Sequence, residues 1–101
     1  MKLSEARVLF KKCQNIGLSG FVVRRHCWKD HPERLFTQME ILNLLLGKGN
    51  LRDNKMPSAK PDSFLWHCKD DENRSVQIAV VFNEDGRITA IAISAFRKVE
   101  Q

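Results

Sequence analysis

The sequence VQIAVVFNEDGRITAIAISAF, residues 76–96, decides the fold class. Residues 76–82 and 87–96 are rich in β-branched side chains, and the turn sequence at residues 83–86 joins them. This arrangement predicts an antiparallel hairpin in which Gly86 supplies a positive φ. Apolar residues fill alternate and intervening positions alike, so both runs are expected to be central strands with at least one covered face.

Upstream of the hairpin, residues 4–16 repeat apolar side chains at three- and four-residue steps, a pattern typical of an amphipathic helix. Ser4 is expected to cap its start, and Gly17 to provide the residue that ends it. The short run at residues 20–26 is interpreted either as a strand or as an extended segment before the next helix.

A second helix is predicted over residues 36–47. Thr37 and Glu40 have capping-box spacing, Phe36 and Ile41 stand where a hydrophobic staple forms, and Gly47 stops the helix. The stripe expected to face the core is made of Met39, Leu42, Leu45 and Leu46.

Residues 48–62 are predicted to form a long polar loop, and residues 63–68 a short strand. The expected fold is therefore α+β, with two helices packed on a small antiparallel β-sheet of three to four strands. Residues 1–101 are expected to form a single domain, because no repeat or low-complexity tract divides them.

Charge is unevenly distributed along the chain. Residues 1–60 carry 12 Lys or Arg against 5 Asp or Glu, whereas residues 61–101 carry 5 against 7. The basic half fits a polyanionic partner, because clustered cations gain affinity by releasing condensed counterions. A basic surface that serves solubility alone is the alternative.

The expected compartment is the cytoplasm, with no membrane partner. The N-terminus interrupts its apolar residues with charges, unlike a signal peptide, and no apolar run is long enough to span a bilayer. Cys13, Cys27 and Cys68 are odd in number and unevenly spaced, which predicts free thiols packed as small apolar residues.

The residues most suited to chemistry lie in residues 24–34, with four basic side chains, two histidines and one tryptophan. RNA cleavage needs a base for the 2′-hydroxyl proton, cations for the phosphorane and an acid for the leaving oxygen. Histidine fills either proton-transfer role, and arginine binds phosphate oxygens in a bidentate way. Trp28 or Trp66 could stack a splayed base. The alternative is a charged connector whose tryptophan packs on the core.

The spacing His26-x7-Arg34, the helix FTQMEILNLL and the strand sequence ITAIAISAF together resemble a bacterial domain family of unknown function. That family is grouped with RelE-like and barnase/EndoU-like ribonuclease toxins, and the resemblance covers residues 20–97. It implies a RelE-like fold of helices on a sheet, and metal-independent RNA cleavage without a cofactor. One departure from the family lies between His26 and Arg34, where the family usually has a second arginine or acidic residue and where Asp30 stands in this sequence.

The leading hypothesis is accordingly a toxin-like RNA endonuclease. Its expected catalytic residues are His26 and Arg34, with His67 as a second acid or base, and Arg97, which the resemblance places where related toxins bind phosphate. The residues expected to bind RNA are Arg24, Arg25, Lys29, Trp28 and Arg52.

Three alternatives stay open. The first is a non-catalytic interaction protein, either an RNA-binding module or an antitoxin-like or immunity-like partner. In an enzyme the proposed catalytic residues should converge on one concave surface, whereas in a binding module they should be spread over a flat or convex one. The second is a structural zinc site built from Cys27, His31, His67 and Cys68. The third is a cysteine nucleophile, Cys27 or Cys68, beside a histidine.

Overall fold

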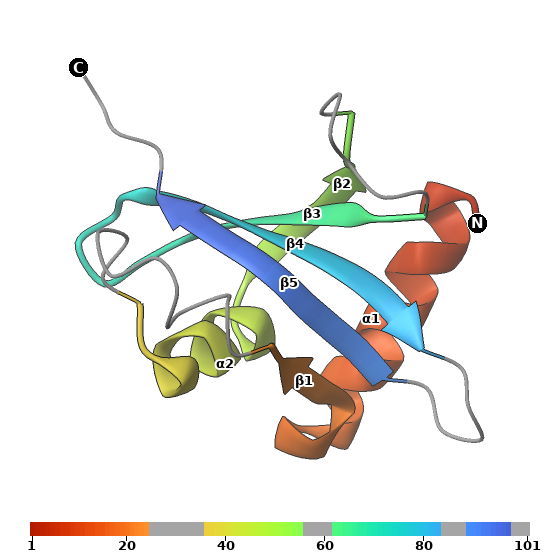
Figure 1. Cartoon of the computed structure of the whole chain (residues 1–101), viewed down its shortest axis with the longest axis horizontal. Coiled ribbons are helices and arrows are strands. Elements are labelled where there is room, and N and C mark those ends of the chain that lie inside the picture. The colour runs from red at the N-terminus through yellow and green to blue at the C-terminus, as the bar shows by residue number, and fades with distance from the viewer. Residues whose placement is uncertain (25–35, 56–61, 84–88, 98–101) are drawn as a thin grey trace.

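The computed structural model describes residues 1–24, 36–55, 62–83 and 89–97, with the backbone alone for Phe96 and Arg97. Within these ranges, two α-helices, one 3-10 turn and five strands follow one another (Figure 1). In order they are α1 (Leu3–Ile16), η1 (Leu18–Gly20), β1 (Phe21–Val23), α2 (Gln38–Leu46), β2 (Gly49–Asp53), β3 (Phe64–Lys69), β4 (Ser75–Asn83) and β5 (Thr89–Arg97).

The strands form one sheet in the order β1-β5-β4-β3-β2. The antiparallel hairpin predicted from residues 76–96 is confirmed as β4 and β5, and the α+β class is confirmed with it. The predicted strand count and purely antiparallel character are wrong, because the sheet has five strands and β1 pairs with β5 in parallel. A three-residue strand carries too little sequence signal to be distinguished from an extended connection.

The extra edge strand, β2, lies within the segment that was expected to be a loop. It pairs antiparallel with β3, and only Leu51 of its five residues is buried. Arg7 of α1 donates from Nε to the Leu51 carbonyl at 3.0 Å, which occupies a backbone acceptor of this edge strand. A polar edge strand with one core residue resembles a loop in sequence, which explains the error.

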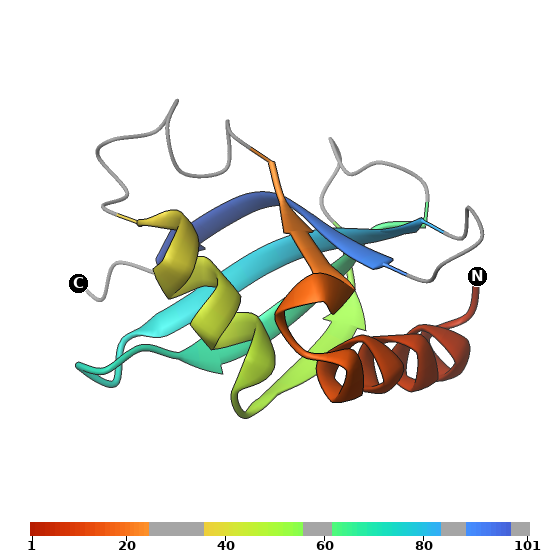
Figure 2. The same ribbon diagram turned by 90° about the horizontal axis from the view of Figure 1, so that it is seen from below.

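Both helices pack on the same face of the sheet, with β1 running between them in Figure 2. Phe10 of α1 stacks on Trp66 of β3, with ring centroids 4.3 Å apart, and meets Phe21 of β1 edge-on at 5.4 Å. The core therefore lies between the helices and one face of the sheet.

Helix α2 begins at a side-chain cap, as predicted: Thr37 Oγ1 accepts a 3.0 Å hydrogen bond from the Glu40 amide. Its predicted stripe is wrong in part. Met39 is 55% exposed, whereas Ile41 and Leu45 are fully buried. The helix has nine residues, little more than two turns. In so short a helix the angle at which it packs on the sheet determines which side chains are buried, and periodicity alone does not fix that angle.

Helix α1 ends at Gly17, whose φ of 97° confirms the predicted glycine stop. Its predicted cap is wrong, because the helix starts one residue earlier, the N-cap position is Lys2, and Ser4 lies inside the first turn. Within the described ranges no helix is long and apolar enough to cross a membrane.

Candidate nucleic-acid interface

The sheet face opposite the two helices, called the open face below, carries no helix of the described part of the chain (Figure 2). Side chains alternate between the two faces along each strand. In β3, Phe64, Trp66 and Cys68 belong to the core, so Leu65, His67 and Lys69 point to the open face.

A polar row crosses the open face, formed by Asn50 of β2, His67 of β3 and Gln77 of β4. The register pairs Asn50 with His67 and His67 with Gln77. Directly opposed residues share a face and have Cβ atoms about 4.5–5.5 Å apart. The imidazole of His67 therefore lies between two carboxamide side chains.

Arg52 occupies the next position of β2 on the same face, opposite Leu65, and is the diagonal neighbour of His67. Burial lowers the pKa of His67 below its ordinary value of 6.5, and the positive charge of Arg52 lowers it further. The imidazole is consequently neutral at pH 7 and can accept a proton. Two residues of the predicted site, Arg52 and His67, are thus brought together.

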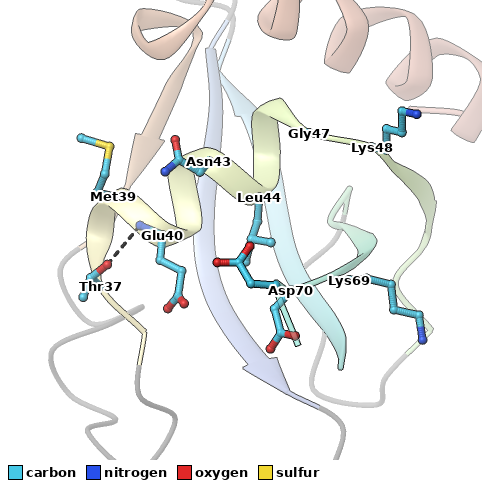
Figure 3. Close-up of a pocket in the computed structure, with 10 residues that line it drawn as sticks. Thr37, Met39, Glu40, Asn43, Leu44, Gly47, Lys48, Lys69 and Asp70 are labelled. Carbon is cyan, nitrogen blue, oxygen red and sulfur yellow. Dashed lines mark hydrogen bonds between the residues drawn. The ribbon is translucent and has the colours of Figure 1, made fainter. Parts of the chain in front are cut away.

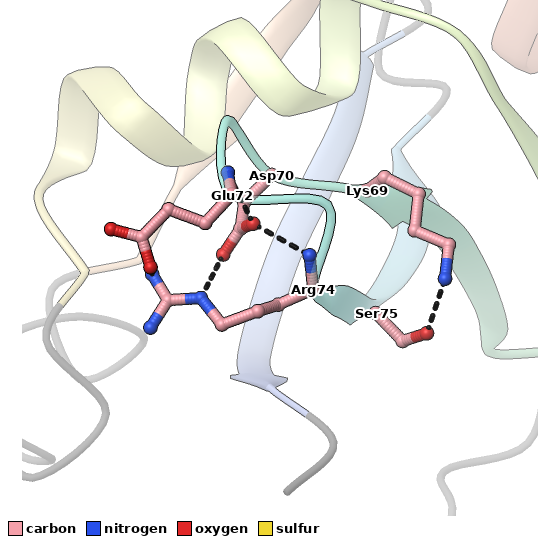
Figure 4. A network of polar contacts seen from close by, with 5 residues as sticks. All are labelled: Lys69, Asp70, Glu72, Arg74 and Ser75. Atoms are coloured by element: carbon pink, nitrogen blue, oxygen red, sulfur yellow. Dashed lines mark hydrogen bonds and ion pairs between the residues drawn. The ribbon is translucent and has the colours of Figure 1, made fainter. Parts of the chain in front are cut away.

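A hollow of about 510 Å³ adjoins the row at the end of the sheet where β3 leads into β4. Lys48, Asn50, His67, Lys69 and Ser75 contribute to its lining, and no carboxylate of the described residues does. Lys69 Nζ donates to Ser75 Oγ at 2.9 Å, which holds that ammonium over the open face (Figure 4). Arg52 on one side of His67, and Lys48 and Lys69 in the adjoining hollow, therefore give this part of the face a positive charge.

The side chains of the polar row have spare hydrogen-bonding capacity. Within the described ranges, Asn50, His67 and Gln77 make no side-chain hydrogen bond. The carboxamide of Gln14 on α1, in contrast, donates to the carbonyls of Leu45 at 2.8 Å and Gly47 at 3.2 Å. The Gln14 amide, which joins α1 to α2, is therefore engaged, whereas the amides of Asn50 and Gln77 on the open face are available to a ligand.

A second hollow, of about 500 Å³, lies between α2 and the β3–β4 turn (Figure 3). Its lining mixes Lys48 and Lys69 with Glu40, Asp70 and Asp71. Mixed charge suits a polyanion less well than the open face does.

The β3–β4 turn is held by Asp70. Its carboxylate accepts hydrogen bonds from the Glu72 and Arg74 amides at 3.0 and 2.8 Å and from Arg74 Nε at 2.8 Å (Figure 4). Asp70 is therefore a structural residue of the turn.

Trp66 was one of the two tryptophans considered for stacking a base, and its burial excludes it from that role. Its side chain is 5% exposed, and its indole Nε1 donates to the Leu44 carbonyl of α2 at 2.9 Å. A tryptophan that is stacked on Phe10 and buried in the core cannot receive a base.

The described residues do not support a cysteine nucleophile or a zinc site. Cys68 is buried on the helix side of the sheet, opposite to the face of His67, as strand alternation requires. Burial and the nearby Asp70 charge raise its pKa to about 11, so it is not a thiolate nucleophile at neutral pH. Cys13 is likewise buried, and its pKa is raised by desolvation. Among the described residues no three His, Cys, Asp or Glu side chains form a metal-binding group.

Among the other predicted site residues, Arg24 stands apart from this cluster. Arg24 follows β1 at the opposite edge of the sheet from Arg52, four strand spacings or about 19 Å away. Arg97 is the last residue of β5 and pairs with Val76. His26, Arg34, Arg25, Lys29 and Trp28 lie outside the described residues, as do the alternative ligands Cys27 and His31.

Sequence reasoning missed Lys48, Asn50, Lys69 and Gln77. The signal that could have found Gln77 and Lys69 is strand alternation, since each occupies a polar position between apolar neighbours of a predicted strand or at its end. Asn50 and Lys48 could not be found without recognising β2.

Comparison of the chain with protein-family models, curated proteins and solved structures finds no match. The resemblance to ribonuclease toxins therefore stays a prediction.

Proposed function

We propose that this chain binds RNA across the open face and cleaves it as a metal-independent endonuclease. The observation that carries the proposal is the position of His67. It is a neutral imidazole beside Arg52 on the sheet face opposite the two helices, next to a hollow lined by Lys48 and Lys69 and by no described carboxylate.

The proposed chemistry uses the 2′-hydroxyl of RNA as nucleophile. His67 takes the hydroxyl proton, the 2′ oxygen attacks the adjacent phosphorus, and the bond from phosphorus to the 5′ oxygen breaks. Arg52 and the two lysines stabilise the negative charge on the phosphorane. The leaving 5′ oxygen needs a proton donor, for which His26 is the sequence-based candidate. The products are a 2′,3′-cyclic phosphate and a 5′-hydroxyl.

The electrostatics fit this assignment. A histidine that serves as base must be unprotonated at working pH, and the lowered pKa of His67 provides that state. The positive charge of Arg52, which lowers the pKa of His67, is also placed to bind a phosphate group of the RNA. The proposal assigns Arg52 to phosphate binding and His67 to proton transfer.

A non-catalytic RNA-binding module is the second candidate. It is favoured by the arrangement of the site on a sheet face, with a single histidine among the described residues there. A positively charged surface can bind the backbone of single-stranded RNA without cutting it.

The deciding experiment is incubation of the purified chain with total RNA in EDTA, comparing wild type with His67→Gln and His26→Ala. Lys12→Ala, which removes an exposed cation from α1 on the other side of the sheet, is the matched control. An endonuclease cleaves RNA as wild type and as Lys12→Ala, and loses at least a hundredfold in rate with His67→Gln. Intact RNA that nevertheless binds the wild type, and binds Lys48→Ala more weakly, identifies the binding module.

A further inference from the structure

We propose that Asn50 and Gln77 recognise the nucleobases on the two sides of the scissile phosphate, so that cleavage depends on base identity there. This inference rests on the proposed function and adds to it the base preference of the site. It starts from the polar row of the open face, in which His67 is the central member.

The geometry of the row sets two carboxamides at opposite sides of one imidazole. Each opposed pair has Cβ atoms about 5 Å apart, so Asn50 and Gln77 are about 10 Å from one another. An RNA strand that crosses β2, β3 and β4 with its scissile phosphate at His67 has one neighbouring nucleoside above each carboxamide. Unpaired bases of single-stranded RNA can be turned toward a protein surface and read along their edges.

Carboxamides are suited to this task because each offers an oxygen acceptor beside an amino donor. Asparagine and glutamine use that pair to make two parallel hydrogen bonds with a base edge, such as N6 and N7 of adenine. Both side chains are available, since neither makes a hydrogen bond within the described part of the chain. Gln77 is half-buried and Asn50 exposed, so both can reach a ligand on this face.

The cations of the same face have a different role. Lys48, Arg52 and Lys69 are charges that contact phosphates, and phosphate contacts fix register without carrying sequence information. Base preference is therefore expected to depend on Asn50 and Gln77, and overall affinity on the cations. This separation makes the inference testable within one face of the molecule.

The test uses a single-stranded RNA pool with four randomised positions around one site, sequenced at its cut ends. The wild type is compared with Asn50→Ala, Gln77→Ala and Lys48→Ala. Each carboxamide variant should lose the base preference on one side of the cut, a discrimination of roughly five- to 150-fold in the wild type. Lys48→Ala should cleave more slowly with both preferences intact. Gln77→Met, which conserves side-chain size, guards against misfolding of Gln77→Ala.

The two proposals fail in different ways. Wild-type cleavage with no base preference, or with preferences unchanged in both carboxamide variants, overturns the role of Asn50 and Gln77 and leaves the endonuclease standing. If the wild type does not cleave, the same pool is partitioned by binding, and enrichment that Asn50→Ala and Gln77→Ala abolish supports base reading by a binding module. A pool that the wild type neither cuts nor binds overturns both.

Discussion

His67 and Arg52 lie diagonally across the β2–β3 pair on the sheet face that neither helix covers. Burial lowers the pKa of the His67 imidazole, and the charge of Arg52 lowers it further. The residues are 15 positions apart in sequence, and they meet because residues 49–53 form an edge strand. The proposed function rests on this relationship and on the lysines that line the adjoining hollow.

Salt should weaken RNA binding steeply. Each phosphate neutralised on a single strand contributes a log–log slope of about −0.7. Lys48→Ala and Arg52→Ala should each make the slope shallower by about that amount, whereas Lys12→Ala should not change it. Fluorescence anisotropy with a labelled single-stranded RNA over a salt series measures these slopes. Identical slopes for all four proteins would remove the open face as the RNA-binding surface.

Gly49 should not tolerate a side chain. A Cβ at this position would stand 2.6 Å from the His67 carbonyl oxygen and 2.6 Å from a ring carbon of Trp66. Gly49→Ala must therefore push β2 away from β3, which costs about 1–3 kcal/mol of unfolding free energy and displaces Asn50 relative to His67. Urea unfolding and RNA binding should both be impaired. A variant with wild-type stability would show that β2 does not approach β3 this closely.

The cap of α2 should matter more than the serine near the start of α1. Thr37→Ala removes the acceptor of the Glu40 amide and should destabilise the chain by about 1 kcal/mol. Ser4→Ala is the matched control, because Ser4 lies within the helix and should change stability by less than about 0.5 kcal/mol. Thermal melting of the two variants checks the contrast, and equal effects would contradict the observed helix start.

Cys68 should be chemically silent in the folded chain. Its pKa of about 11 leaves it protonated at pH 7.5, and it lies in the core. An alkylating reagent should label Cys68 at least tenfold more slowly in the native chain than in urea, as read by mass spectrometry. Cys68→Ala should retain any RNA cleavage by the wild type, and loss of cleavage in a folded Cys68→Ala would revive the cysteine nucleophile.

Much of the fold could be predicted from sequence because its strongest elements carry local signals. The β4–β5 hairpin has two long β-branched runs, and α2 has a threonine cap with a glycine end. Strand β2 and the β1–β5 pairing could not be predicted, because their residues become strand only through long-range pairing. Met39 was placed in the core by periodicity alone, and the packing of α2 exposed it.

The candidate site was predictable only in its individual residues. Arg52 and His67 were selected for their chemical type, but their proximity depends on the β2–β3 register. Trp66 was selected for the same kind of reason and proved to be a core residue, because nothing in its local sequence reveals the partner carbonyl of Leu44. Residue type alone thus suggests candidate site residues, and the register between strands determines which of them lie close enough to act together.

The most direct test of the central claim is the pH dependence of RNA cleavage by wild type and Arg52→Gln in EDTA. Neutral His67 is the proposed base, so the rate should rise with pH through an acid limb whose midpoint is below 6.5, where the imidazole loses its proton. Removing the Arg52 charge stabilises the protonated imidazole, so the midpoint should move to higher pH in Arg52→Gln, and His67→Gln should have no such limb. An acid limb that is the same in all three proteins, or the absence of cleavage by the wild type at every pH, would contradict the assignment of His67 as the base.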